Sequence, residues 1–157
     1  MKVLYAIILG VMLTFFVGLG IEAFYPTEKY PEPPIEIQYM NETKTGGFTD
    51  EQKQIQKDFD QKLKSYQTRN ETHARNVSII AVIVSIIYLT LSLTVLVKTD
   101  TVFADGFLTG SLITLLYSII RGIETNDNKF RFIIVTIGLI IALTLGYIKF
   151  MRSKKIT

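Results

Sequence analysis

Two ionisable residues of opposite charge, Glu22 and Arg121, lie near the ends of long apolar segments. An uncompensated charge at membrane depth costs free energy, so such groups tend to face the interior of a helix bundle and to pair with one another. We therefore predict a structural ion pair between Glu22 and Arg121 that joins the ends of two membrane spans. The alternative is that both side chains extend separately into the lipid headgroups.

Other residue types that carry chemistry are sparse. The chain has no cysteine and a single histidine, His73, whereas a protein zinc site normally needs several such ligands. A histidine-dependent nucleophile would have to recruit this one residue, and no phosphate-binding or dinucleotide-binding glycine motif is present. We predict no catalytic, metal-binding or cofactor-binding residues and a protein that is not an enzyme.

The elements that would hold Glu22 and Arg121 are predicted from four apolar segments. The chain is 48% hydrophobic with a mean hydropathy of +0.32. Because a bilayer core needs about 20 apolar residues in a helix, these segments are typical of membrane spans. We predict an all-α membrane protein whose four transmembrane helices form an antiparallel bundle. The predicted spans are residues 3–25, 76–98, 101–123 and 130–150.

A long polar segment, residues 26–75, separates the first two spans and carries eight basic and nine acidic residues. Its proline-rich part, 26–34, favours an extended backbone. Residues 35–40 alternate apolar and polar side chains, which is compatible with one short strand. Residues 50–75 are predicted to be helical, and no proline or glycine separates them from the second span, so the two are compatible with one continuous helix.

The predicted helix at 50–75 is amphipathic, with a narrow apolar stripe on a polar surface. We expect these apolar side chains to be covered by another part of this chain or by a partner, because a stripe of them exposed to water is unfavourable. It is either covered by the segment 35–40 of the same chain or it is the contact stripe for a partner. Its residues are Ile55, Phe59, Leu63 and Tyr66.

Small residues recur at every fourth position in three of the spans. This spacing places them on one face and allows close approach of helix backbones. The pattern predicts packing within the bundle, and it is equally compatible with oligomerisation. The positions are Gly10, Thr14 and Gly18, then Gly106, Gly110, Thr114, Ser118 and Gly122, and finally Gly138, Ala142 and Gly146.

The distribution of basic residues predicts the orientation of the chain. Six Lys or Arg residues lie in the segments on the side of the termini, and three lie in the short turn opposite, so we expect both termini in the cytoplasm. The basic tail, 151–157, is then cytoplasmic and 26–75 is extracytoplasmic. In an alternative that stays open, the first segment is a cleaved signal peptide and three spans remain. The absence of cysteine and the high content of Lys and Ile favour a prokaryotic source and its plasma membrane.

The predicted function follows from this architecture and from the lack of catalytic groups. We expect a scaffold, assembly factor or accessory subunit that acts by protein–protein interaction. Its expected partners are the lipid bilayer and either further copies of itself or another membrane or extracytoplasmic protein. An oligomeric channel or transporter component is the alternative. Nucleic acid is not an expected partner, because the net charge of +3 does not form one basic patch.

Overall fold

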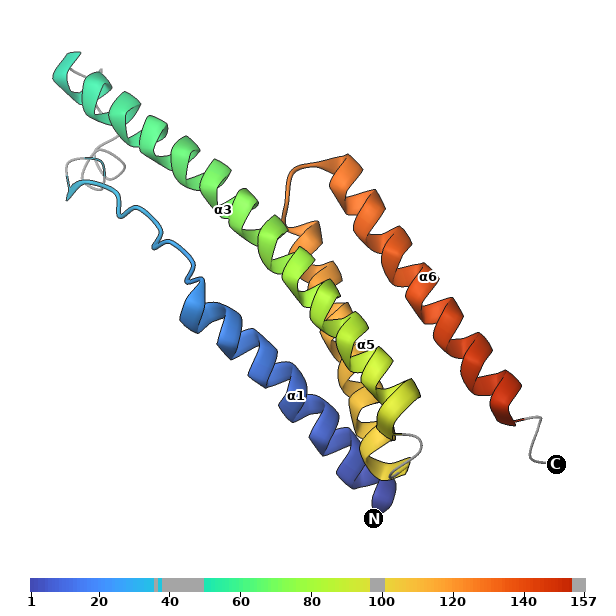
Figure 1. Cartoon of the computed structure of the whole chain (residues 1–157). Helices are drawn as coiled ribbons and strands as arrows, with labels where there is room; N and C mark the ends of the chain where they lie inside the picture. Colours follow the sequence, from blue (N-terminus) through green and yellow to red (C-terminus); the bar gives the residue numbers. More distant parts are fainter. Residues whose placement is uncertain (36, 38–49, 97–100, 154–157) are drawn as a thin grey trace. The chain divides into compact units, whose positions relative to one another are not determined.

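The computed structural model of this chain describes residues 1–35, 37, 50–96 and 101–153, and its secondary structure there is helical (Figure 1). The elements are α1 (Lys2–Phe24), α3 (Asp50–Leu91), a π-helical segment η1 (Ser92–Leu96), α5 (Thr101–Ile123) and α6 (Asn128–Ser153). Among the described residues, four helices are long and apolar enough to cross a membrane. The protein therefore has the helix content of a multi-pass membrane protein.

The chain divides into two compact units, which we describe separately. The apolar unit comprises Met1–Pro26 and Ala74–Thr157, and the polar unit comprises Thr27–His73. Helix α3 contributes to both units, because its first turns are rich in Gln, Lys and Asp and its last turns are apolar. It is one helix from Asp50 to Leu91, and the weak helix formers Thr68, Asn70 and Thr72 do not interrupt it.

The ends of two helices follow from local chemistry. Helix α1 stops before Pro26, because the residue that precedes a proline is disfavoured in the helical region. That residue, Tyr25, has φ −140° and donates its N–H to the carbonyl of Ile21 at 2.7 Å. At the start of α6, the Asp127 carboxylate accepts from the N–H groups of Lys129 and Phe130 at 2.9 and 3.3 Å, which is a side-chain cap.

The short strand predicted for residues 35–40 is wrong at the two positions the structure describes. Ile35 and Ile37 are helical, and the Ile37 N–H donates to the carbonyl of Pro34 at 3.0 Å. A single strand without a pairing partner leaves its backbone N–H and C=O groups without hydrogen bonds. A helical turn instead forms a backbone hydrogen bond within the same segment. Residues 36 and 38–40 lie outside the described part of the chain.

Helix α5 is the centre of the apolar unit and contacts α1 on one face. The Thr14 hydroxyl lies 3.3 Å from the Thr114 hydroxyl, and the rings of Tyr5 and Phe103 pack edge to face at 6.1 Å. Residue numbers rise together along this contact, so α1 and α5 run in the same direction. This direction is the one expected for the first and third spans of a bundle whose consecutive helices are antiparallel, because odd-numbered spans of a multi-pass chain cross the membrane in the same direction. The antiparallel bundle as a whole stays a prediction.

A second face of α5 meets the apolar part of α3 and η1 through three buried serines, which we call the serine seam. Each serine hydroxyl donates to a backbone carbonyl of α5, at 2.6 to 2.8 Å. The pairs recur every seven residues along both helices. Residue numbers rise along one helix as they fall along the other, so the two helices are antiparallel here. They are Ser78 with Ser118, Ser85 with Ser111, and Ser92 with Ala104.

The third face of α5 packs on α6. A Cβ added at Gly122 would meet Ile134 Cγ2 at 2.9 Å, and one added at Gly138 would meet Ile119 Cδ1 at 2.8 Å. Val82, Leu115 and Ile134 form a buried cluster here. A second cluster, Val17, Ile21, Val77 and Tyr88, joins α1 to α3.

Much of the remaining apolar surface is exposed. The exposed fraction is 75% for Phe16 on α1 and 74% for Phe132 on α6. A water-soluble protein would bury such side chains, whereas hydrocarbon solvates them without cost. These exposed faces are what a membrane-spanning helix presents to lipid.

Candidate functional site

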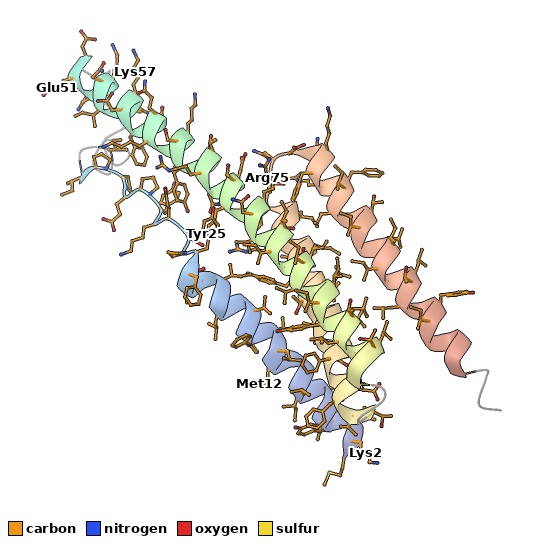
Figure 2. All side chains as sticks on the ribbon, in the orientation of Figure 1. Lys2, Met12, Tyr25, Glu51, Lys57 and Arg75 are labelled. Atoms are coloured by element: carbon orange, nitrogen blue, oxygen red, sulfur yellow. The ribbon has the colours of Figure 1, made fainter. Side chains whose placement is uncertain are left out.

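The polar unit combines the first part of α3 with the proline-rich segment before it. The four residues of the predicted contact stripe, Ile55, Phe59, Leu63 and Tyr66, are all half-buried, while most of their neighbours on α3 are exposed. Figure 2 shows two of these exposed residues, Glu51 and Lys57, projecting from the polar part of α3. The structure therefore places the stripe on the covered side of this helix.

Part of that cover is the proline-rich segment. The ring of Tyr30 packs edge to face on the ring of Tyr66, with centroids 5.4 Å apart. Next to it, Arg69 Nε donates to Glu28 Oε2 at 2.7 Å. This exposed ion pair contributes little free energy by itself, but with the aromatic contact it fixes the segment on the helix. The predicted cover, residues 35–40, lies mostly outside the described residues.

A charged cleft of about 560 Å³ lies between the proline-rich segment and α3. Three cationic side chains and one carboxylate line it, so it has a positive excess. Tyr66 adds an aromatic side chain to the lining of the cleft. The lining residues are Lys29, Pro31, Asp58, Gln61, Lys62, Ser65, Tyr66 and Arg69.

The sequence missed this cleft, although it had a signal for it. The proline content of 26–34 predicts only an extended backbone, yet Tyr30 lies in this segment and Tyr66 lies on the stripe. A tyrosine supplies a large contact area at a small entropic cost, so both residues were candidates for packing.

The structure gives Arg121 a local acidic partner. Arg121 Nη1 donates to Glu124 Oε2 at 2.7 Å, across three residues of the same helix end. Two further ion pairs, Lys53 with Asp50 and Arg69 with Glu28, lie in the polar unit. The Glu22–Arg121 pair stays a prediction. A double-mutant cycle with Glu22→Gln and Arg121→Met tests it, and additive effects on stability would exclude the pair.

The predicted small-residue stripes fall into two groups. Gly10, Gly106, Gly110, Gly122 and Gly138 lie so close to neighbouring helices that a Cβ on any of them would meet an atom within 3.3 Å. Gly18 and Gly146 have nothing within 4 Å of an added Cβ, and Ala142 is exposed. Thr114 and Ser118 are buried, and Thr14 is half-buried.

No family model, curated protein or solved structure matches this chain. Within the described ranges, no group of three or more His, Asp or Glu side chains is arranged to hold a metal ion. His73 is buried at the end of the polar unit.

The buried serine hydroxyls of the apolar unit donate to backbone carbonyls. Besides the serine seam, Ser118 Oγ donates back to the Ser78 carbonyl at 2.8 Å, and Ser111 Oγ donates to the Leu108 carbonyl at 2.7 Å. The buried hydroxyl-bearing side chains of the spans also include Thr114 and Tyr88, and the Thr114 hydroxyl lies 3.3 Å from that of Thr14. Hydrogen bonds between helices contribute to helix association in lipid.

Proposed function

We propose that this chain is a multi-pass membrane protein that acts through protein–protein interaction, with the polar unit as its contact surface. The observation that carries the proposal is that Thr27–His73 forms a compact unit of its own around a charged, aromatic-floored cleft. Tyrosine and arginine are enriched where proteins bind one another. No metal ligand set and no catalytic constellation among the described residues favours an enzyme.

In this proposal the apolar helices anchor the polar unit. They form a four-span bundle in which consecutive spans run in opposite directions, and the small residues of the stripes allow the backbones to approach. The termini lie in the cytoplasm and the polar unit lies outside the plasma membrane, as the distribution of basic residues favours. A membrane anchor and an extracytoplasmic contact surface are sufficient for a scaffold, assembly factor or accessory subunit.

The alternative of an oligomeric channel has less support. A pathway through one protomer would need polar side chains facing an open cavity, whereas the buried serine hydroxyls already bond to backbone carbonyls. A pore would therefore have to form between copies of the chain. Ion flux from the purified protein in liposomes would favour this alternative.

The proposal is tested by photo-crosslinking in cells of the source organism. A photoreactive amino acid replaces Gln61, which lines the cleft, or Gln56, which is exposed on α3 outside it. We expect discrete protein adducts from position 61 and few from position 56, because only the first lies where a partner would bind. Lys62→Glu should reduce the position-61 adducts, whereas Lys57→Glu should not.

Two outcomes would reject the proposal. Adducts of equal yield at positions 61 and 56 would indicate random encounter, and adducts at 61 that are insensitive to Lys62→Glu would mean that the cleft does not contribute. As a broader check, deletion of Asp50–Arg69 should abolish partner capture. The same deletion should leave ion flux intact if the chain is a channel component.

A further inference from the structure

An apolar groove runs between α1 and α3 in the apolar unit, with a volume of about 370 Å³. Its aromatic lining residues are Phe16 and Phe24 of α1, Tyr25 directly after α1, and Tyr88 of α3. No charged side chain lines it. The lining residues are Phe16, Val17, Gly20, Ile21, Phe24, Tyr25, Ile80, Val84 and Tyr88.

The floor of this groove is fixed by packing beneath it. Val17, Ile21 and Tyr88 belong to the buried cluster that joins α1 to α3. The Tyr88 ring is held edge to face against Phe107 of α5, with centroids 5.5 Å apart. A floor made of buried, interlocked side chains does not collapse when the groove is empty.

The groove stays open because Gly20 has no side chain. A Cβ added at Gly20 would meet nothing within 4 Å, so the space beside it is free. The lining residues of α1 from Phe16 to Phe24 extend over about 12 Å of helix, at 1.5 Å per residue. The hollow is therefore elongated along the helix axes.

One end of the groove is polar. Asn76 Nδ2 donates to the Tyr25 hydroxyl at 3.1 Å, and a smaller hollow that shares Tyr25 and Ile80 with the groove continues to this pair. Tyr25 is the residue at which α1 ends. Figure 2 shows Tyr25 at this end of α1, away from Lys2 at the other. Tyrosine at the end of a span commonly marks the level of the lipid headgroups.

We propose that this groove holds one acyl chain of a phospholipid, with its headgroup at the level of Tyr25 and Asn76. The lining belongs to two helices that are long and apolar enough to cross a membrane, so the surrounding medium is hydrocarbon. A single hydrocarbon chain can fill a hollow of about 370 Å³ that is elongated along the helix axes, whereas a packed helix would insert only separate side chains into it. The site does not depend on the proposed function.

The matched pair Gly20→Leu and Gly18→Leu tests this site. Neither position has an atom within 4 Å of an added Cβ, but only Gly20 lines the groove. Native mass spectrometry of the protein released from detergent should show one retained phospholipid in the wild type and in Gly18→Leu. We expect Gly20→Leu to lose most of this retained lipid, because the leucine side chain occupies part of the groove and removes packing contacts of the acyl chain.

A second measurement keeps the proposal falsifiable if Gly20→Leu does not fold. A phospholipid with a diazirine in its acyl chain is crosslinked to the wild-type protein in vesicles, and the labelled peptides are identified. Labelling concentrated on residues 16–24 and 80–88 supports the groove. Labelling spread evenly over exposed residues such as Phe132 and Leu139 of α6, or equal lipid retention by the two glycine variants, overturns it.

Discussion

At the scale of single residues, the glycines of one sequence pattern behave differently. Gly10 and Gly18 belong to the same predicted stripe of α1, eight residues apart. A Cβ at Gly10 would meet the backbone nitrogen of Gly110 at 2.8 Å, while a Cβ at Gly18 would meet nothing within 4 Å. The close contact of α1 with α5 therefore lies around Gly10, and at Gly18 no neighbouring atom comes within contact distance.

This contrast predicts opposite effects of one substitution. Both Gly10→Ala and Gly18→Ala gain up to about 1 kcal/mol of helix propensity. At Gly10 the new methyl group clashes with backbone and with Thr109 Cβ at 2.9 Å, so we expect a net destabilisation of about 1–3 kcal/mol. Thermal unfolding in detergent measures both variants. A Gly10→Ala protein as stable as Gly18→Ala would contradict the close contact.

At the scale of elements, α3 contacts α5 through hydroxyl groups that bond to the other helix. Three serines of α3 and η1 donate to carbonyls of α5, whereas Thr90, Thr136 and Thr144 donate to carbonyls of their own helices. The first kind of bond joins two helices and the second does not. Association of helices in lipid depends on such contacts, because apolar burial gives little preference for protein over lipid.

The serine seam predicts a measurable difference between two triple variants. Replacing Ser78, Ser85 and Ser92 by alanine removes three interhelical bonds and should cost about 2 kcal/mol, at roughly 0.6 each. Replacing Thr90, Thr136 and Thr144 by alanine removes only bonds within one helix and should cost almost nothing. Unfolding of both proteins in the same detergent gives the comparison. Equal losses of stability would show that the seam does not join the helices.

At the scale of the whole molecule, the four apolar helices and the polar unit form two separate compact units. The polar unit carries charges of both signs, and the apolar unit exposes aromatic and aliphatic side chains. This division of surface chemistry is what a protein needs if one part lies in lipid and the other in water.

The orientation of the whole chain is predicted from its basic residues, and the absence of native cysteine makes the test clean. Single cysteines at Lys53 or Lys129 should react with a membrane-impermeant maleimide on intact cells, while one at Lys2 should react only after permeabilisation. The cysteine-free parent is the control. Labelling of positions 53 and 129 from opposite sides of the membrane would contradict the four-span arrangement. Labelling of position 2 on intact cells, with positions 53 and 129 reacting only after permeabilisation, would contradict the predicted orientation.

The sequence alone determined that the chain has four apolar helices and an amphipathic stripe, because hydrophobic length and periodicity are local properties. It also contained the seven-residue spacing of Ser78, Ser85 and Ser92, which would have indicated one helix face. It did not indicate a bonding partner for these hydroxyls, because their acceptors are backbone carbonyls, which every residue has.

Only the tertiary structure decided which residues of each sequence pattern make contacts with other parts of the chain. It separated Gly10 from Gly18, placed Tyr30 on Tyr66, and gave Arg121 the carboxylate of Glu124. It also left a groove beside Gly20, between helices that are far apart in the sequence. The physical reason is that contact depends on where two helix axes approach and where they separate. That distance is set by all the side chains between the axes and not by the spacing of residues along one of them.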